Sequence, residues 1–100
     1  MSKSVSELNK ETAKYMGYEE QSNQLVEECA ELIQAVSKYR RAVTEEEKAV
    51  TLENLIEEIA DVEIMLEQVK YLLHIPEEEI EAVKVFKVNR TRERIVSKGA

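Results

Sequence analysis

Apolar residues recur at steps of three and four positions along most of the chain, which is the spacing of one face of an α-helix. Between residues 19 and 40 the recurring positions are Leu25, Cys29, Leu32, Val36 and Tyr39. Between residues 45 and 74 they are Leu52, Leu55, Ile59, Val62, Leu66, Val69 and Leu73. The pattern predicts two long helices, over about 19–40 and 45–74, each with one apolar face.

Start and stop signals define these helices and predict two more. Residues 4–7 and 44–47 each begin with Ser or Thr and carry Glu three positions later, a pairing that caps helix N-termini. The first predicts a helix over about 5–16, which Gly17 ends. Pro76 breaks the long third helix and suits the first position of a fourth, which runs to about residue 96. The expected fold class is therefore all-α, with four helices in a bundle and the two long ones as an antiparallel hairpin.

Composition agrees with this class and limits the possible partners. The 100 residues include 35% charged residues, 43% hydrophobic residues, two Gly and one Pro, which favours helices in a single domain over residues 1–100. A domain of this size buries only a modest core, so we expect a homo-oligomer, a dimer or a tetramer.

The net charge of −7 opposes binding to a nucleic acid polymer. The N-terminus lacks the apolar segment of a signal peptide, and no apolar run approaches the roughly 20 residues that span a membrane. We therefore expect no membrane partner and a cytoplasmic location.

The two long helices contain the same acidic motif, offset by 30 positions. Residues 25–32 read LVEECAEL and residues 55–62 read LIEEIADV, so every position matches in chemical type. At about 100° per residue, Glu28 lies about 60° from Leu25 and borders the apolar face, with Glu31 one turn further along. Glu58 and Asp61 take the same angles relative to Leu55. Each helix thus carries two carboxylates on the flank of its packed face.

An antiparallel hairpin would bring these four acids to one level, because the break at 41–44 lies midway between the motifs. Four carboxylates in a half-buried site repel one another and favour a compensating cation. Oxygen donors without histidine favour Mg²⁺, or else Mn²⁺, over zinc or copper. We therefore predict a metal site built from Glu28, Glu31, Glu58 and Asp61. For any single Glu a solvated helix face is the simpler interpretation; the duplicated pair favours the site.

These motifs resemble the MazG-like nucleotide pyrophosphohydrolases of the all-helical NTP pyrophosphatase superfamily. The family motif, EExxE followed by ExxD, is matched by Glu27, Glu28 and Glu31 and then by Glu58 and Asp61. Downstream, residues 87–94 (KVNRTRER) are similar to a KxNRxxxR string that such proteins carry near bound phosphates, although Thr91-Arg92 stands where many members have Lys-Phe. The resemblance covers about residues 16–95.

The resemblance implies Mg²⁺-dependent hydrolysis of nucleoside triphosphates, dNTPs among them, between the α- and β-phosphates. The products would be a nucleoside monophosphate and pyrophosphate, and nucleotide-pool cleansing is one context. It also implies phosphate contacts from Lys87, Asn89, Arg90 and Arg94. Spacing independently places Lys87, Arg90, Thr91, Arg94 and Lys98 on one helix face, where they clamp a triphosphate or merely complement the helix dipole.

Glu27 and Glu57 lie one residue round the helix from the metal ligands. They either support those ligands through hydrogen bonds or accept a proton from the attacking water, and we favour support. Two alternatives stay open. One is an inactive helical module that dimerises through its apolar faces. The other is a phosphoribosyl-ATP pyrophosphohydrolase or a dUTPase-like relative with the same metal ligands.

Overall fold

The chain forms four helices joined by short connections, as expected. This computed structural model describes residues 2–99. The helices are α1 (Val5–Met16), α2 (Tyr18–Arg41), α3 (Glu45–Leu72) and α4 (Glu77–Ser97), and no strand occurs within the described range. In the same range no helix is both long enough and apolar enough to cross a membrane. The predicted all-α class with four helices is confirmed.

Local signals explain where each helix begins and ends. The Ser4 hydroxyl accepts from the Glu7 amide at 3.0 Å, and the Glu7 carboxylate accepts from the Ser4 amide at 3.1 Å. Thr44 and Glu47 make the same pair of bonds at 3.0 and 2.9 Å before α3. Gly17 separates α1 from α2 at φ 88°, a region that favours glycine because it has no Cβ.

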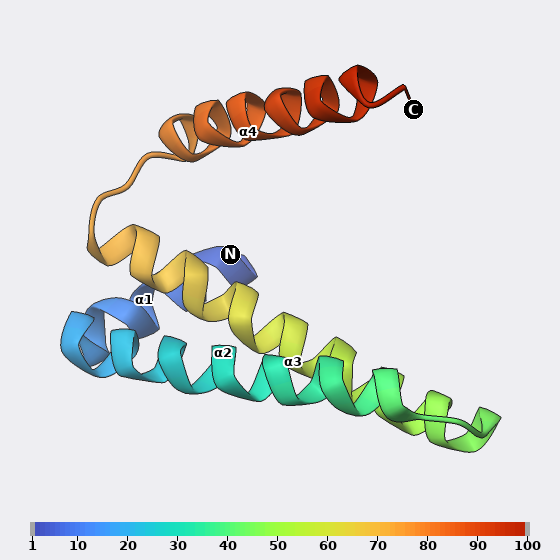
Figure 1. Ribbon diagram of the computed structural model, residues 1–100. Coiled ribbons are helices and arrows are strands. Elements are labelled where there is room, and N and C mark those ends of the chain that lie inside the picture. Colours follow the sequence, from blue (N-terminus) through green and yellow to red (C-terminus); the bar gives the residue numbers. More distant parts are fainter. Residues whose placement is uncertain (1, 100) are drawn as a thin grey trace.

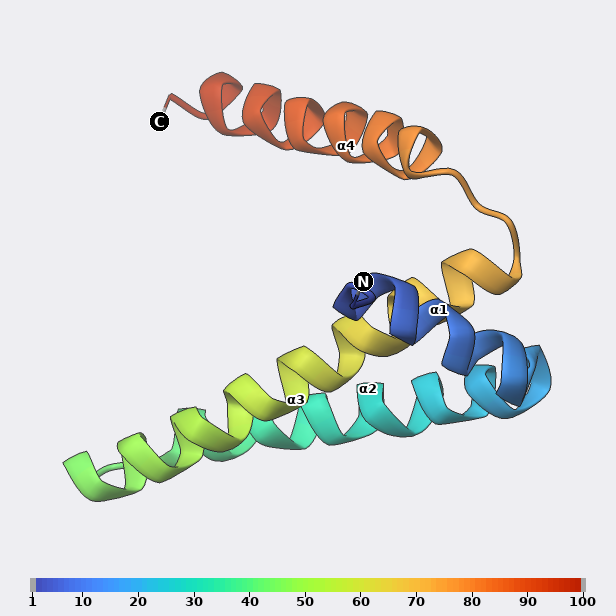
Figure 2. The same ribbon diagram turned by 180° about the vertical axis from the view of Figure 1, so that it is seen from behind.

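Three of the four helices pack together. Helices α2 and α3 lie side by side along most of their length, with α1 against both at the end remote from their connection (Figures 1 and 2). Helix α4 packs against none of the other three and runs above them (Figure 1); its first residue, Glu77, makes one ion pair with Lys70 of α3. Within one chain, therefore, the expected bundle contains three helices, and the fourth stands apart.

One series of buried and half-buried residues recurs at steps of four and three on each of α2 and α3, the two helices that pack together most extensively. On α2 the series is Gln21, Leu25, Glu28, Leu32 and Ala35; on α3 it is Thr51, Leu55, Glu58, Val62, Met65, Val69 and Leu72. We call this set the seam. A four-three spacing keeps one side of a helix facing its partner, as in coiled coils. Two of the predicted metal ligands thus occupy positions that usually hold apolar side chains.

The predicted apolar face of α3 was partly wrong. Leu55, Val62 and Val69 face the seam, but Leu52, Ile59, Leu66 and Leu73 stay 42–46% exposed. The packed face of α3 is rotated toward Glu58 and Met65. Its position is set by the fit against α2 and not by the most apolar stripe of α3. The four uncovered side chains recur every seven residues and leave an apolar flank open to solvent.

A buried polar chain fixes α1 to this pair. Gln21 and Gln68 are only 6% and 3% exposed. The Gln21 side-chain amide donates to the Gln68 side-chain oxygen at 2.6 Å, and the Gln68 amide donates to the Asn9 side-chain oxygen at 2.6 Å. Asn9 donates in turn to Glu67 at 2.8 Å. Because each of these hydrogen bonds requires one particular alignment of the helices, this buried chain of polar side chains sets the register of α1, α2 and α3.

Candidate metal centre

Three carboxylates from two helices gather in the middle of the seam. One carboxylate oxygen from each of Glu28, Glu31 and Glu58 lies within 4.8 Å of the other two. Glu28 and Glu58 are half-buried, whereas Glu31 is exposed. The two long helices thus converge on one acidic cluster that is covered on the seam side and open on the Glu31 side.

Two of these carboxylates each have one oxygen without a partner. The Oε2 atoms of Glu28 and Glu58 are buried and accept no hydrogen bond in the described structure. The other Glu28 oxygen accepts from the Gln24 amide at 2.8 Å, one turn earlier on α2. A buried acceptor without a donor is unfavourable unless something replaces the lost water. Both unpartnered oxygens are therefore candidate ligands for a cation.

Electrostatics within the cluster also favour a cation. Burial, together with the negative charges of Glu31, Asp61 and Glu28, raises the pKa of Glu58 above its ordinary value. The negatively charged form of Glu58 is therefore disfavoured unless a cation compensates it. Oxygen donors from carboxylates suit Mg²⁺ or Mn²⁺, and the donor set contains no nitrogen or sulfur. The residues present fit a hard divalent ion.

The remaining predicted site residues lie outside the set of three carboxylates. Asp61 is half-buried and acts on Glu58 through its charge, but its oxygens lie outside the set of three. Glu27 and Glu57 are exposed neighbours of the cluster. The predicted phosphate contacts are not brought to the carboxylates, because all four residues lie exposed on α4, which does not pack against α2 or α3: Lys87, Asn89, Arg90 and Arg94.

Gln24 is a site residue to which the sequence analysis gave no function. Its spacing to Glu28, four residues along one helix, is a signal that could have indicated the contact, since such pairs meet on a helix surface. The bond engages one oxygen of Glu28 and leaves the other, which is buried, without a partner.

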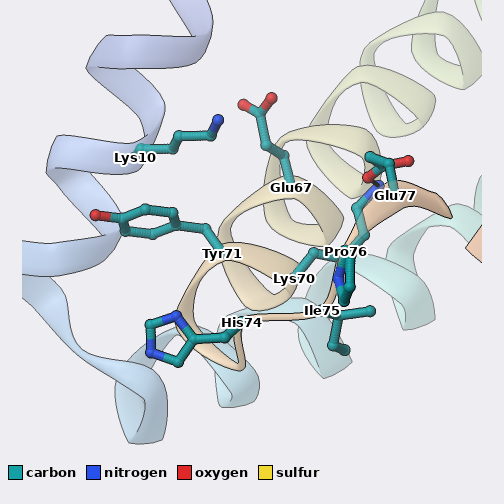
Figure 3. A pocket seen from close by; sticks show the side chains of 8 residues that line it. All are labelled: Lys10, Glu67, Lys70, Tyr71, His74, Ile75, Pro76 and Glu77. Atoms are coloured by element: carbon teal, nitrogen blue, oxygen red, sulfur yellow. Dashed lines mark ion pairs between the residues drawn. The ribbon is translucent and has the colours of Figure 1, made fainter. Parts of the chain in front are cut away.

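A concave region lies at the far end of α3, about 20 Å along the helix from Glu58 at 1.5 Å per residue. It is a pocket of about 550 Å³ where α1, the end of α3 and the turn into α4 meet. Figure 3 shows Lys10 of α1 directed toward Glu67 and Tyr71 turned toward α1, with the Lys10 ammonium 6.0 Å from the Tyr71 ring centre.

The acids that line this pocket already have partners. Glu67 accepts hydrogen bonds from Asn9 and Ser6, and Glu77 pairs with Lys70 at 2.6 Å. These bonds lower the pKa of both carboxyls. The pocket therefore lacks the unpartnered carboxylates of the cluster and serves to hold the turn between α3 and α4.

Comparisons with protein families, with curated proteins and with solved structures find no match for the chain. The acidic cluster is therefore the feature of the chain that bears most directly on its function.

Proposed function

We propose that the chain is a Mg²⁺-dependent nucleoside triphosphate pyrophosphohydrolase of the MazG-like type, with α2 and α3 as its antiparallel hairpin. It would cleave between the α- and β-phosphates and release a monophosphate and pyrophosphate. One observation carries the proposal: two helices place Glu28, Glu31 and Glu58 within 4.8 Å, with two buried oxygens unpartnered. A structural salt bridge pairs each carboxylate with a basic side chain, whereas carboxylates gathered without such partners are typical of a cation site.

The chain's own residues divide the work as follows. Glu28 and Glu58 would hold the ion from the seam side, Gln24 would keep Glu28 oriented, and Glu31 would complete the set on the open side. Asp61 would join them or support Glu58. The bound ion would neutralise phosphate charge and lower the pKa of a water for attack on phosphorus. Glu27 and Glu57, both exposed beside the ligands, would orient them or accept the proton of that water.

Phosphate binding requires cations that the acidic cluster lacks. Lys87, Asn89, Arg90 and Arg94 of α4 would supply charge-assisted hydrogen bonds to the triphosphate. They lie away from the cluster within one chain, so this role requires α4 to approach the cluster, from the same chain or from another copy. The net charge of −7 makes both the ion and these cations necessary for binding a polyanion.

The test is a panel of NTPs and dNTPs incubated with Mg²⁺ and scored for monophosphate plus pyrophosphate. It includes dUTP and phosphoribosyl-ATP, which would identify the two related activities. Glu58→Gln removes one ligand charge and should abolish turnover, whereas Glu53→Gln makes the same change at an exposed site of α3 and should not. Release of orthophosphate instead of pyrophosphate, or full activity in Glu58→Gln, would refute the proposal.

A second candidate is an inactive helical module, and one observation favours it. Large apolar side chains remain uncovered on the packed helices, among them Ile33 at 70% and Ile56 at 58% exposure. Such surfaces suit association between helices. This candidate expects Mg²⁺ to bind no better to the wild type than to Glu58→Gln.

A further inference from the structure

Helix α4 packs against no other helix of its own chain. Its first residue, Glu77, pairs with Lys70 of α3, but residues 81–97 are all exposed. No ion pair joins two residues within α4 among those the described chain contains. Helices in proteins gain most of their stability from packing one face, and isolated helices of modest length are marginal in water. Helix α4 would therefore gain stability from a partner that packs against one of its faces.

The charges of α4 are divided along its length. Its first half carries Glu77, Glu78, Glu79 and Glu81 with one base, Lys84, whereas its second half carries Lys87, Arg90, Arg92 and Arg94 with one acid, Glu93. Two copies of such a helix repel in a parallel pair, where acids meet acids. They attract in an antiparallel pair, where the acidic half of each meets the basic half of the other. A second copy of α4 is thus a complementary partner.

One face of α4 has the spacing that such a pair needs. Glu81, Val85, Val88 and Arg92 follow steps of four, three and four, and at 100° per residue they share a narrow sector. Val85 is 52% and Val88 61% exposed. Both valines lie equally far from the midpoint between Phe86 and Lys87, and so do Glu81 and Arg92.

We propose that α4 is a self-association surface, which pairs antiparallel with α4 of a second copy along Glu81, Val85, Val88 and Arg92. Two-fold symmetry sets Val85 against the partner copy's Val88 at the centre. The same symmetry places Glu81 beside the partner copy's Arg92 on both sides of these valines. A two-fold pair therefore repeats each favourable contact twice.

A second face of α4 has the same spacing, with Glu79, Val83, Phe86 and Arg90 at steps of four, three and four. Its two-fold centre lies between Lys84 and Val85, so an antiparallel pair there overlaps only residues 77–92 and leaves the last turn of the helix unpaired. The proposed face is centred between Phe86 and Lys87, and its pair overlaps residues 77–96. The proposed pair leaves Lys87, Arg90 and Arg94 on its outer side. Self-association and phosphate binding thus use opposite faces of the helix, and the inference does not depend on the proposed enzymatic activity.

Charge reversal in the full-length chain tests the pairing by sedimentation. Glu81→Arg or Arg92→Glu alone creates two like-charged contacts per pair and should raise the dissociation constant about tenfold or more. The double variant restores opposite charges and should return to within about threefold of wild type. Glu93→Arg makes the same charge change about 120° from the pairing face and should have little effect.

Circular dichroism on the same samples follows helix content, which should fall in the single variants as α4 loses its partner and recover in the double variant. Unchanged dissociation in the single variants would overturn the proposal and indicate that α4 packs on its own chain. Weak association that the double variant fails to rescue would overturn it as well.

The direction of the pair is tested separately with spin labels on cysteines in a Cys29→Ala background. Labels at Asn89→Cys and at Val96→Cys occupy equivalent sides of α4. An antiparallel pair separates the two copies' labels by about 8 Å along the axis at the first position and about 29 Å at the second. Similar short distances at both positions would indicate a parallel pair and overturn the proposed register.

Discussion

Replacing Glu58 by Gln should remove the stabilisation of the chain by Mg²⁺. A ligand that binds only the folded state at 100 times its Kd stabilises it by about 2.7 kcal/mol. For a domain of this size each kcal/mol moves Tm by about 4–8 °C, so the wild type should gain about 11–22 °C. Glu58→Gln loses one of three gathered carboxylates, and we expect affinity to fall about 100-fold. The remaining gain at the same concentration is then below about 4 °C.

The assay is thermal unfolding with and without Mg²⁺ at constant ionic strength, since added salt alone screens the acidic surface. Glu53→Gln is the matched control because it removes the same charge from an exposed position of α3, and it should keep the full Mg²⁺ effect. Equal Mg²⁺-dependent gains in wild type and Glu58→Gln would refute the metal site.

The pH dependence of stability in wild type and Glu58→Gln tests the direction of the Glu58 pKa shift. The raised pKa of Glu58 means that the folded state binds this proton more tightly than the unfolded state does. Without Mg²⁺, the contribution of Glu58 to stability is therefore present below the ordinary carboxyl pKa and is lost as pH rises through the raised value. Glu58→Gln should remove this loss. With Mg²⁺, protons compete for the ligand, so the Tm gain should shrink as pH falls through the raised pKa. A gain independent of pH would contradict this account.

Three further predictions concern packing. Hydrogen bonds lower the pKa of Glu67, so this carboxylate stabilises the fold above the ordinary carboxyl pKa, and the stabilisation is lost as pH falls through the lowered value. Glu67→Gln should therefore reduce the loss of unfolding free energy at acid pH, measured by urea titration. An unchanged pH dependence would contradict this account. Gln68→Ala leaves groups of Gln21 and Asn9 without partners, so unfolding free energy should drop by about 2–4 kcal/mol, and a loss below about 1 would count against the buried chain. Met65→Ala, at a site 5% exposed, should cost about 2–4 kcal/mol by urea unfolding, against a small loss for any exposed apolar position of α3.

Much of the local structure could be predicted because its causes lie within a few residues. Ser4 with Glu7 and Thr44 with Glu47 cap helices through bonds across three positions. Gly17 ends α1 through its own backbone conformation. These interactions need no distant partner, so the four helices and nearly all their bounds follow from the chain alone.

The sequence predicted which acids could form the candidate metal centre, but not which of them lie closest together. The duplicated motif identified Glu28, Glu31 and Glu58, because equal spacing on two helices gives equal angles. The sequence treated Asp61 as an equal fourth member, whereas the structure leaves it outside the closest set. Small rotations of α3 about its axis decide which of two acids one turn apart reaches the partner helix, and spacing alone does not fix that rotation.

The sequence by itself determined the helices, their caps and the acidic positions available for a cation, since each depends on local bonds and on the periodicity of one helix. Only the tertiary structure decided that the seam passes through Glu58 rather than Ile59, that Asn9, Gln21 and Gln68 share a buried chain, and that α4 stands free. These outcomes depend on how one helix surface fits another, and that fit is a property of two distant segments together.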